Sequence, residues 1–156
     1  MGAGKSTIAN LLRHKLKRTA ILKIEDVREL ISDFKHNSED HALAWKIIYR
    51  MCDEYFKNGI SVQLEQTVAS KEIVNKFLSL AKRHKCSIGF YHVRAPKNIL
   101  LDRIHSRSKD RKATKALIMS NIKKHEAMIY PGATVLDTSK VSSNEAVKII
   151  LTRVKV

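Results

Sequence analysis

Apolar residues recur along the chain in two patterns, one typical of strands and the other typical of amphipathic helices. Short apolar runs predict strands, and longer stretches with apolar positions three or four residues apart predict helices. The two patterns alternate along the sequence. Helices are predicted over 4–17, 25–34, 39–57, 70–85, 98–107, 113–129 and 143–154, and strands over 19–24, 60–64, 87–93 and 134–136.

This alternation predicts an α/β fold with a mostly parallel sheet. The chain of 156 residues is long enough for a proper core, and it contains no repeat, low-complexity tract or linker. We therefore predict one domain over residues 1–156. In such sheets the ligand lies at the carboxyl ends of the strands, so the residues that follow the strands are candidates for function.

The net charge of the chain favours anionic partners. Thirty lysine and arginine residues against fifteen acidic residues give a formal net charge of +15. This charge suits nucleotide phosphates, and it also suits RNA or DNA, but a solvated lysine surface is the alternative because the lysines are spread along the chain.

The cysteines and the apolar runs bear on the compartment. Cys52 and Cys86 stand alone without metal-ligand spacing, which fits a reducing compartment. No apolar run is long enough to span a membrane, and no signal peptide precedes the first helix. We expect a cytoplasmic protein with no membrane contact.

The segment M-G-A-G-K-S-T at residues 1–7 matches the second half of the phosphate-binding loop G-x-x-x-x-G-K-[ST]. Its small residues let backbone N–H groups form a nest for phosphate oxygens, and the helix that follows adds its positive dipole end. Lys5 is expected to reach the β- and γ-phosphates of ATP, and Ser6 to bind Mg²⁺. A glycine-containing cap of an ordinary helix is the alternative. The predicted nucleotide-binding residues are Gly2, Ala3, Gly4, Lys5, Ser6 and Thr7.

Acidic residues follow three of the predicted strands, and a helix cap is the alternative for such residues. They are Glu25 with Asp26, Glu65 and Asp137, and Asp26 is the one that best fits a cap. Glu25 follows the strand at 19–24, and Glu65 follows the strand at 60–64. One of them could accept the proton of an attacking hydroxyl or position it, and the other could hold Mg²⁺ through water. Arg28, one helical turn past Glu25, could orient that carboxylate or clamp an anionic substrate, with a surface ion pair as the alternative.

Arginines recur every four residues near the middle of the second half of the chain. Arg103, Arg107 and Arg111 would line one face of a helix. Phosphoryl transfer needs cations that neutralise the charge on the transferred group, so Arg107 and Arg111 are candidates for a lid. A solvated basic face is the alternative.

Taken in order, these motifs resemble the small P-loop kinases, a group of AAA-type ATP-binding domains. The group includes the zeta-toxin, chloramphenicol phosphotransferase, gluconate and shikimate kinases and the polynucleotide 5′-kinases. The resemblance covers essentially the whole chain. It rests on G-A-G-K-S-T, E-D-V-R, S-V-Q-L-E-Q-T, R-A-P-K-N-I-L-L-D-R-I-H-S-R and T-V-L-D-T-S.

The resemblance implies a three-layer α/β/α P-loop fold with a lid at about 103–115, on which Arg103 and Arg107 are the lid arginines. It also implies that 136–139 lies near the adenine pocket. The D-x-x-R of the group falls on Glu25 and Arg28, and its V-I-L-D-x-T falls on 62–67, so both acids are glutamates here. The longer side chain leaves open how base and metal roles are divided.

The group's central strand and the leading glycine of its loop would precede Met1. We therefore expect the first, central strand to be missing from this chain and the native polypeptide to start upstream. An intact mass of the native protein equal to that of the 156-residue chain would contradict this expectation.

The function predicted from the sequence is that of an ATP-dependent phosphotransferase that uses ATP and Mg²⁺. Lys5, Glu25, Arg103 and Arg107 are the predicted catalytic residues. Glu25 and Arg28 would bind the acceptor, and Ser6 with Glu65 would hold Mg²⁺. The acceptor is a hydroxyl of a small molecule or nucleoside, or the 5′-hydroxyl of RNA or DNA. A nucleotide-binding module that does not catalyse is the alternative, and the sequence leaves the oligomeric state open.

Overall fold

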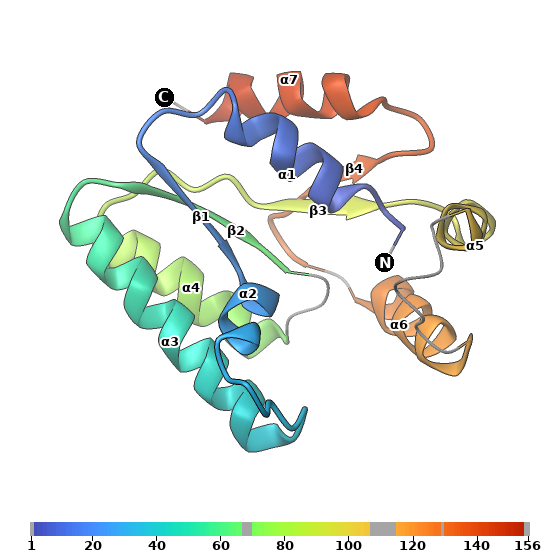
Figure 1. Cartoon of the computed structure of the whole chain (residues 1–156). Coiled ribbons are helices and arrows are strands. Elements are labelled where there is room, and N and C mark those ends of the chain that lie inside the picture. Colours follow the sequence, from blue (N-terminus) through green and yellow to red (C-terminus); the bar gives the residue numbers. More distant parts are fainter. Residues whose placement is uncertain (1, 67–69, 107–114, 129, 155–156) are drawn as a thin grey trace. The chain divides into compact units, whose positions relative to one another are not determined.

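The computed structural model describes residues 2–66, 70–106, 115–128 and 130–154, in which helices and strands alternate as the sequence predicts (Figure 1). The strands are β1 (Thr19–Lys23), β2 (Ser61–Glu65), β3 (Tyr91–Arg94) and β4 (Thr134–Asp137). The helices are α1 (Lys5–Arg13), α2 (Ile24–Glu29), α3 (Ser38–Lys57), α4 (Lys71–Arg83), α5 (Lys97–His105), α6 (Lys115–Ala127) and α7 (Ser143–Arg153).

The strands pair in parallel, which confirms the α/β fold. β1 pairs with β2 from Thr19↔Ser61 to Lys23↔Glu65, and β3 pairs with β4 from Tyr91↔Thr134 to Arg94↔Asp137. The pairs form two separate two-stranded sheets, and a strand that joins them is not among the described residues. Parallel neighbours need a long crossover, and helices supply it in each pair.

The chain divides into two compact units. One consists of Met1–Leu12 and Gly89–Lys155, and it contains β3, β4 and helices α1, α5, α6 and α7. The other consists of Arg13–Ile88, with β1, β2 and helices α2 to α4. The single domain predicted from the sequence stays a prediction.

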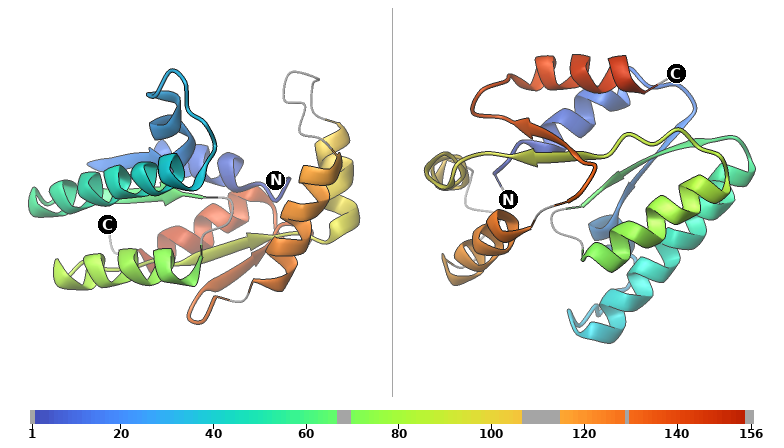
Figure 2. Two further views of the ribbon diagram at one scale, coloured as in Figure 1. Left: turned by 90° about the horizontal axis from the view of Figure 1, so that it is seen from below. Right: turned by 180° about the vertical axis from the view of Figure 1, so that it is seen from behind.

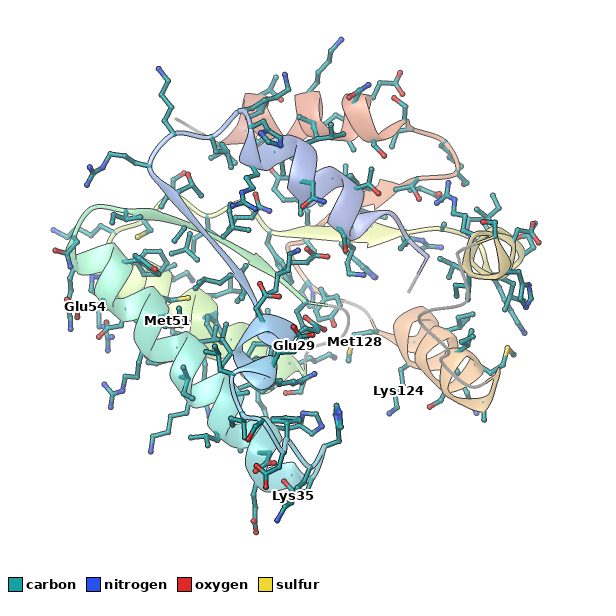
Figure 3. The ribbon with its side chains drawn as sticks, viewed as in Figure 1. Glu29, Lys35, Met51, Glu54, Lys124 and Met128 are labelled. Atoms are coloured by element: carbon teal, nitrogen blue, oxygen red, sulfur yellow. The ribbon has the colours of Figure 1, made fainter. Side chains whose placement is uncertain are left out.

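The 13–88 unit packs α3 and α4 side by side on one face of the β1–β2 pair (Figures 1 and 2). Ile24 and Ile48 are fully buried, and Cys52 and Leu80 are 1% exposed. Apolar side chains of α2, α3 and α4 therefore pack together in one cluster. Met51 is one of the partly buried residues that pack against this cluster (Figure 3). Most of the apolar positions that predicted helix 39–57 therefore lie in or against this cluster, whereas Leu43 is 45% exposed.

Asp53 is a charged residue within this apolar packing. Its carboxylate lies 2.8 Å from Arg83 Nη2, 2.8 Å from His84 Nε2 and 3.1 Å from Lys57 Nζ. The hydrogen bond with His84, followed by that with Lys57, lowers the pKa of Asp53. A buried carboxylate needs such partners to be stable, and these link α3 to the end of α4.

In the other unit, α1 and α7 lie beside each other on one face of the β3–β4 pair (Figures 1 and 2). Ile8 and Leu12 are buried on α1, and Val147 and Ile150 are buried on α7. Their spacing of three or four residues places each pair on one helix face. This packing fixes α1, and α1 in turn fixes the loop that precedes it.

Three element boundaries differ from the sequence prediction by four residues or more. α2 ends at Glu29 instead of residue 34. α1 ends at Arg13 instead of residue 17, and the chain then turns through Arg18 at φ 44°. β3 begins at Tyr91 instead of residue 87, because its partner β4 spans only the four residues Thr134–Asp137. None of the described helices is long and apolar enough to cross a membrane.

Candidate functional site

The segment Gly2–Thr7, which we call the phosphate loop, has the backbone that its glycines allow. Gly2 has φ +77° and Gly4 has φ +83°, while Ala3 between them does not have a positive φ and is 2% exposed. Alternation of positive and negative φ along the backbone is typical of an anion-binding nest. Helix α1 begins at Lys5, within this segment, and its first hydrogen bond runs from Ile8 N to Gly4 O at 3.0 Å. The positive end of a helix dipole therefore adjoins this loop.

Close packing also requires glycine at position 2. A Cβ atom there would lie 2.9 Å from the carbonyl oxygen of Leu100 and 3.3 Å from Ile104 Cγ1. A Cβ atom at Gly4 would lie 3.6 Å from Thr138 Cγ2, which is ordinary contact. The loop is thus held against α5 at Gly2 and against the end of β4 at Gly4.

A cavity of about 370 Å³ opens beside the phosphate loop. This volume lies in the range of about 300–1,000 Å³ that small-molecule sites occupy. All of its lining belongs to one unit of the chain, and hydroxyl groups and one guanidinium dominate it. The lining residues are Gly2, Gly4, Thr7, Arg103, Thr138, Val141, Ser142 and Ser143.

Arg103 and Thr138 form a hydrogen-bonded pair at the edge of this cavity. Arg103 Nη1 donates to Thr138 Oγ1 at 2.7 Å and to Gly2 O at 3.4 Å, and Arg103 Nη2 donates to Thr138 O at 2.8 Å. Thr138 Oγ1 also lies 3.2 Å from Ala3 O and 3.3 Å from Arg94 O. Both carbonyl groups at the start of the phosphate loop are therefore bound to this pair.

The connection from β4 to α7 is ordered by its own side chains. Asp137 Oδ1 accepts from Ser139 Oγ at 2.6 Å and from Ser139 N at 3.0 Å, and these bonds lower the pKa of Asp137. Ser142 caps α7 in a capping box with Glu145, whose pKa is lowered by its bonds to Ser142. The wall of the cavity formed by 138–143 is therefore built on a hydrogen-bonded turn and a capped helix.

The structure brings some of the predicted site residues together. Lys5, Ser6 and Thr7 form the first turn of α1, and Thr7 lines the cavity. Arg103, on α5, lines the same cavity as Gly2 and Gly4. Arg107 lies outside the described residues, as does most of the predicted lid at 103–115.

The remaining predicted residues belong to the 13–88 unit. Glu65 is the last residue of β2 and pairs with Lys23 of β1. Glu25 lies just after β1, in the first turn of α2, and its side chain is exposed. Because the two strands are parallel, both acids lie at the carboxyl edge of the β1–β2 pair. The guanidinium carbon of Arg28 lies 5.8 Å from the centre of the Phe34 ring, within cation–π distance.

Sequence reasoning missed three residues of the cavity wall, Val141, Ser142 and Ser143. A signal for two of them was present in the sequence. Ser142-Ser-Asn-Glu145 is a capping-box pattern, which fixes the start of a helix at this position. Val141 carries no such signal, because its contact with the cavity depends on how the turn after β4 folds.

Comparisons with known proteins bear on the family and the fold of the chain. The family model described as AAA domain matches residues 1–130. A comparison with curated proteins finds no match. Among solved structures, a sugar kinase from Janibacter sp. HTCC2649, unliganded, is 18% identical with a TM-score of 0.73, and the match covers 97% of this chain and 88% of that one. The tunicamycin resistance protein of Deinococcus radiodurans is 16% identical with a TM-score of 0.65, over 97% of this chain and 88% of that one. The chain therefore belongs to the AAA domain family and has the fold of small P-loop kinases.

Proposed function

We propose that this protein is an ATP-dependent phosphotransferase that moves the γ-phosphate of ATP to a hydroxyl group. The observation that carries the proposal is the phosphate loop, with its two glycines at positive φ, leading into α1 beside a cavity of about 370 Å³. A polyphosphate fits the loop by charge, and a nucleoside fits the size of the cavity. Membership of the AAA domain family supports the same nucleotide.

The phosphates are held by the backbone of Gly2–Thr7 and by the ammonium group of Lys5. Mg²⁺, when bound, neutralises phosphate charge and orients the β- and γ-phosphates. Ser6 supplies a hydroxyl that would hold it, and Glu65 stays the carboxylate that the sequence motif assigns to this ion. Two protein oxygens suit this ion, because Mg²⁺ keeps several waters and is otherwise held by the substrate's phosphates. Within the described residues no cluster of three or more histidine, cysteine or acidic side chains forms a metal cage, and this mode of binding needs none.

The acceptor is activated by Glu25 in this proposal. Its carboxylate takes the proton of the acceptor hydroxyl as the oxygen bonds to the γ-phosphorus, and the bond to the β,γ-bridging oxygen breaks to release ADP. Glu25 is exposed, at the carboxyl edge of the β1–β2 pair, where an acceptor can reach it. Arg28, on the same helix, holds an anionic group of the acceptor. Arg107 and Arg103 supply positive charge for the transferred group.

Charge and fold together bear on the class of acceptor. The formal net charge of +15 favours acceptors that carry phosphate or another anionic group, which includes the 5′ end of RNA or DNA. The sugar kinase of the same fold makes a sugar hydroxyl a second candidate. Both classes present the alcohol group that the Glu25 carboxylate requires.

The test measures binding and transfer separately. ATP binding is measured by calorimetry with Mg²⁺, and transfer is measured with γ-labelled ATP and a panel of sugars, nucleosides and 5′-hydroxyl RNA. We expect acceptor-dependent label transfer by the wild-type protein and its loss in Lys5→Ala. The matched control is Lys15→Ala, an exposed lysine just beyond α1. Binding without transfer to any acceptor would instead indicate a nucleotide-binding module that does not catalyse, and absence of binding would overturn both.

A further inference from the structure

We propose that Thr138 is a positioning residue that, together with Arg103, holds the phosphate loop in its anion-binding shape. The inference rests on the proposed nucleotide-binding function, and it concerns a residue that contacts the loop instead of the phosphates. It assigns Arg103 a role beyond supplying charge to the transferred group.

The backbone of Thr138 is fixed by the β3–β4 pair. Thr138 follows the last residue of β4, and its N–H donates to the carbonyl oxygen of Arg94 at 2.9 Å. This bond continues the parallel pairing by one step beyond the strand. The side chain of Thr138 therefore starts from a rigid element and not from a free loop.

The hydroxyl of Thr138 connects three segments of the chain. It accepts from Arg103 Nη1 at 2.7 Å, and it lies 3.2 Å from Ala3 O and 3.3 Å from Arg94 O. A hydroxyl has one hydrogen to donate and two lone pairs. It therefore accepts from the arginine and donates to one carbonyl at a time, either that of the phosphate loop or that of β3.

Arg103 completes the hydrogen-bonded link between Thr138 and the phosphate loop, and we call this link of Arg103 and Thr138 the tether. Its Nη2 donates to Thr138 O at 2.8 Å, and its Nη1 donates to Thr138 Oγ1 and, at 3.4 Å, to Gly2 O. A guanidinium is planar and carries its donors in a fixed fork, so two bonds to one threonine define its orientation. The carbonyl of Gly2 then meets a donor whose position is already set.

Holding two carbonyls also sets the direction of two N–H groups. In a planar trans peptide the C=O of one residue and the N–H of the next point in opposite directions. Binding Gly2 O and Ala3 O therefore fixes the directions of the N–H groups of Ala3 and Gly4. These are the donors that a phosphate nest requires, so the tether determines whether the loop is preorganised for an anion.

The methyl group of Thr138 also faces the loop. Its Cγ2 lies 3.6 Å from the position that a Cβ atom on Gly4 would occupy, so it borders the loop at the residue before α1. Thr138 thus uses both of its branches. Valine keeps its shape without the hydroxyl, and serine keeps the hydroxyl without the methyl group, which separates the two contributions.

The experiment compares Thr138→Val, Thr138→Ser and the control Thr152→Val for ATP affinity, transfer kinetics and unfolding by denaturant. Thr152 also donates its hydroxyl to a backbone carbonyl, that of Ile149 at 2.9 Å, but on α7 and away from the cavity lining. We expect Thr138→Val to raise the Kd for ATP about tenfold or more, and Thr138→Ser to stay within about threefold of wild type. Thr152→Val should leave the Kd unchanged.

Arg103→Lys provides a second arm, because lysine cannot make the forked contact with Thr138. The double variant Arg103→Lys with Thr138→Val should raise the Kd by a smaller factor than the product of the two single increases, because both substitutions break the same tether. An unchanged Kd for folded Thr138→Val, even with reduced stability, would overturn the proposal and leave Thr138 a purely structural residue. ATP binding with this pattern but without transfer would support the tether while the kinase proposal fails. Absence of ATP binding in the wild type would overturn both.

Discussion

Asp53 on α3 and Arg83 at the end of α4 are joined by an ion pair with 2.8 Å between Oδ1 and Nη2. Asp53 is 8% exposed, so this carboxylate is largely removed from water. His84 Nε2 lies at the same distance, 2.8 Å, from the same oxygen, and Lys57 approaches the other oxygen at 3.1 Å. One side chain of α3 therefore anchors the C-terminal end of α4.

This carboxylate should make the stability of the protein depend on acid pH. Its partners lower the pKa of Asp53 in the folded state below the ordinary value of 3.8. The stabilisation is complete above that ordinary value and is lost progressively as the pH falls below it. We expect the difference in unfolding free energy between wild type and Asp53→Asn to stay constant from pH 6 to about pH 4 and to shrink as the pH falls further, as measured by urea denaturation. The control is Glu54→Gln, whose exposed side chain projects from α3 (Figure 3). An equal difference at every pH would contradict this assignment.

Gly2→Ala should weaken nucleotide binding more than it weakens the fold. The substitution puts a side chain at φ +77° and brings its Cβ to 2.9 Å from Leu100 O. Strained backbone of this kind costs about 1–3 kcal/mol, and the contact forces the loop to move as well. We expect an increase in the Kd for ATP of about tenfold or more by calorimetry. Gly132→Ala is the matched control, because Gly132 has φ +78° with nothing within 4 Å of a Cβ atom. Equal effects of the two variants on the Kd would contradict the role of close packing at Gly2.

Glu25 and Glu65 should affect different kinetic quantities. If Glu25 takes the proton of the acceptor, Glu25→Gln lowers kcat by about a hundredfold or more at unchanged Mg²⁺ dependence. If Glu65 holds Mg²⁺, Glu65→Gln raises the Mg²⁺ concentration needed for half-maximal transfer. Glu29→Gln serves as the control, since Glu29 is an exposed residue of α2 (Figure 3). The opposite pattern would exchange the two roles, and wild-type behaviour of both variants would remove both residues from the mechanism.

The two cysteines should differ in reactivity. Cys52 is 1% exposed, and burial raises the pKa of its thiol to about 12. Cys86 is only half-buried, although burial raises its pKa too. The thiolate is the reactive form, so iodoacetamide at pH 8 should alkylate Cys86 in the folded protein and leave Cys52 unmodified, as read by peptide mass mapping. Both should react in denaturant, and Cys86→Ser should abolish labelling of the folded chain. Alkylation of Cys52 at the rate of Cys86 would contradict this.

Much of the fold could be predicted from the sequence because its elements carry their own periodicity. The apolar positions of 39–57 predict α3, and Ile48 and Cys52 are buried on it. The limits of β3 could not be predicted, because a strand ends where its partner ends, and the register of β3 with β4 begins only at Tyr91↔Thr134. Local pattern sets the type of an element, and pairing sets its length.

The candidate site could be predicted only where a sequence motif has a known chemical role. The phosphate loop could be predicted because glycine, lysine and serine each have a defined role at that spacing. The tether was not readable in the same way. In the sequence, Thr138 is simply a residue after a strand, and Arg103 is one of several arginines. Only the fold brings both side chains to the carbonyl groups of Gly2 and Ala3.

The order of synthesis gives this tether a further consequence. Arg103 lies 101 residues after Gly2, and Thr138 lies 135 residues after Ala3. On the ribosome the loop emerges long before either side chain that holds it, and a whole compact unit, Arg13–Ile88, emerges in between. Closing so long a segment of chain is an entropic cost that must be met before the contacts form. Affinity for ATP should thus arise only after β4 and Thr138 have been synthesised, so a nascent chain halted before β4 would carry the intact loop motif and still fail to bind the nucleotide.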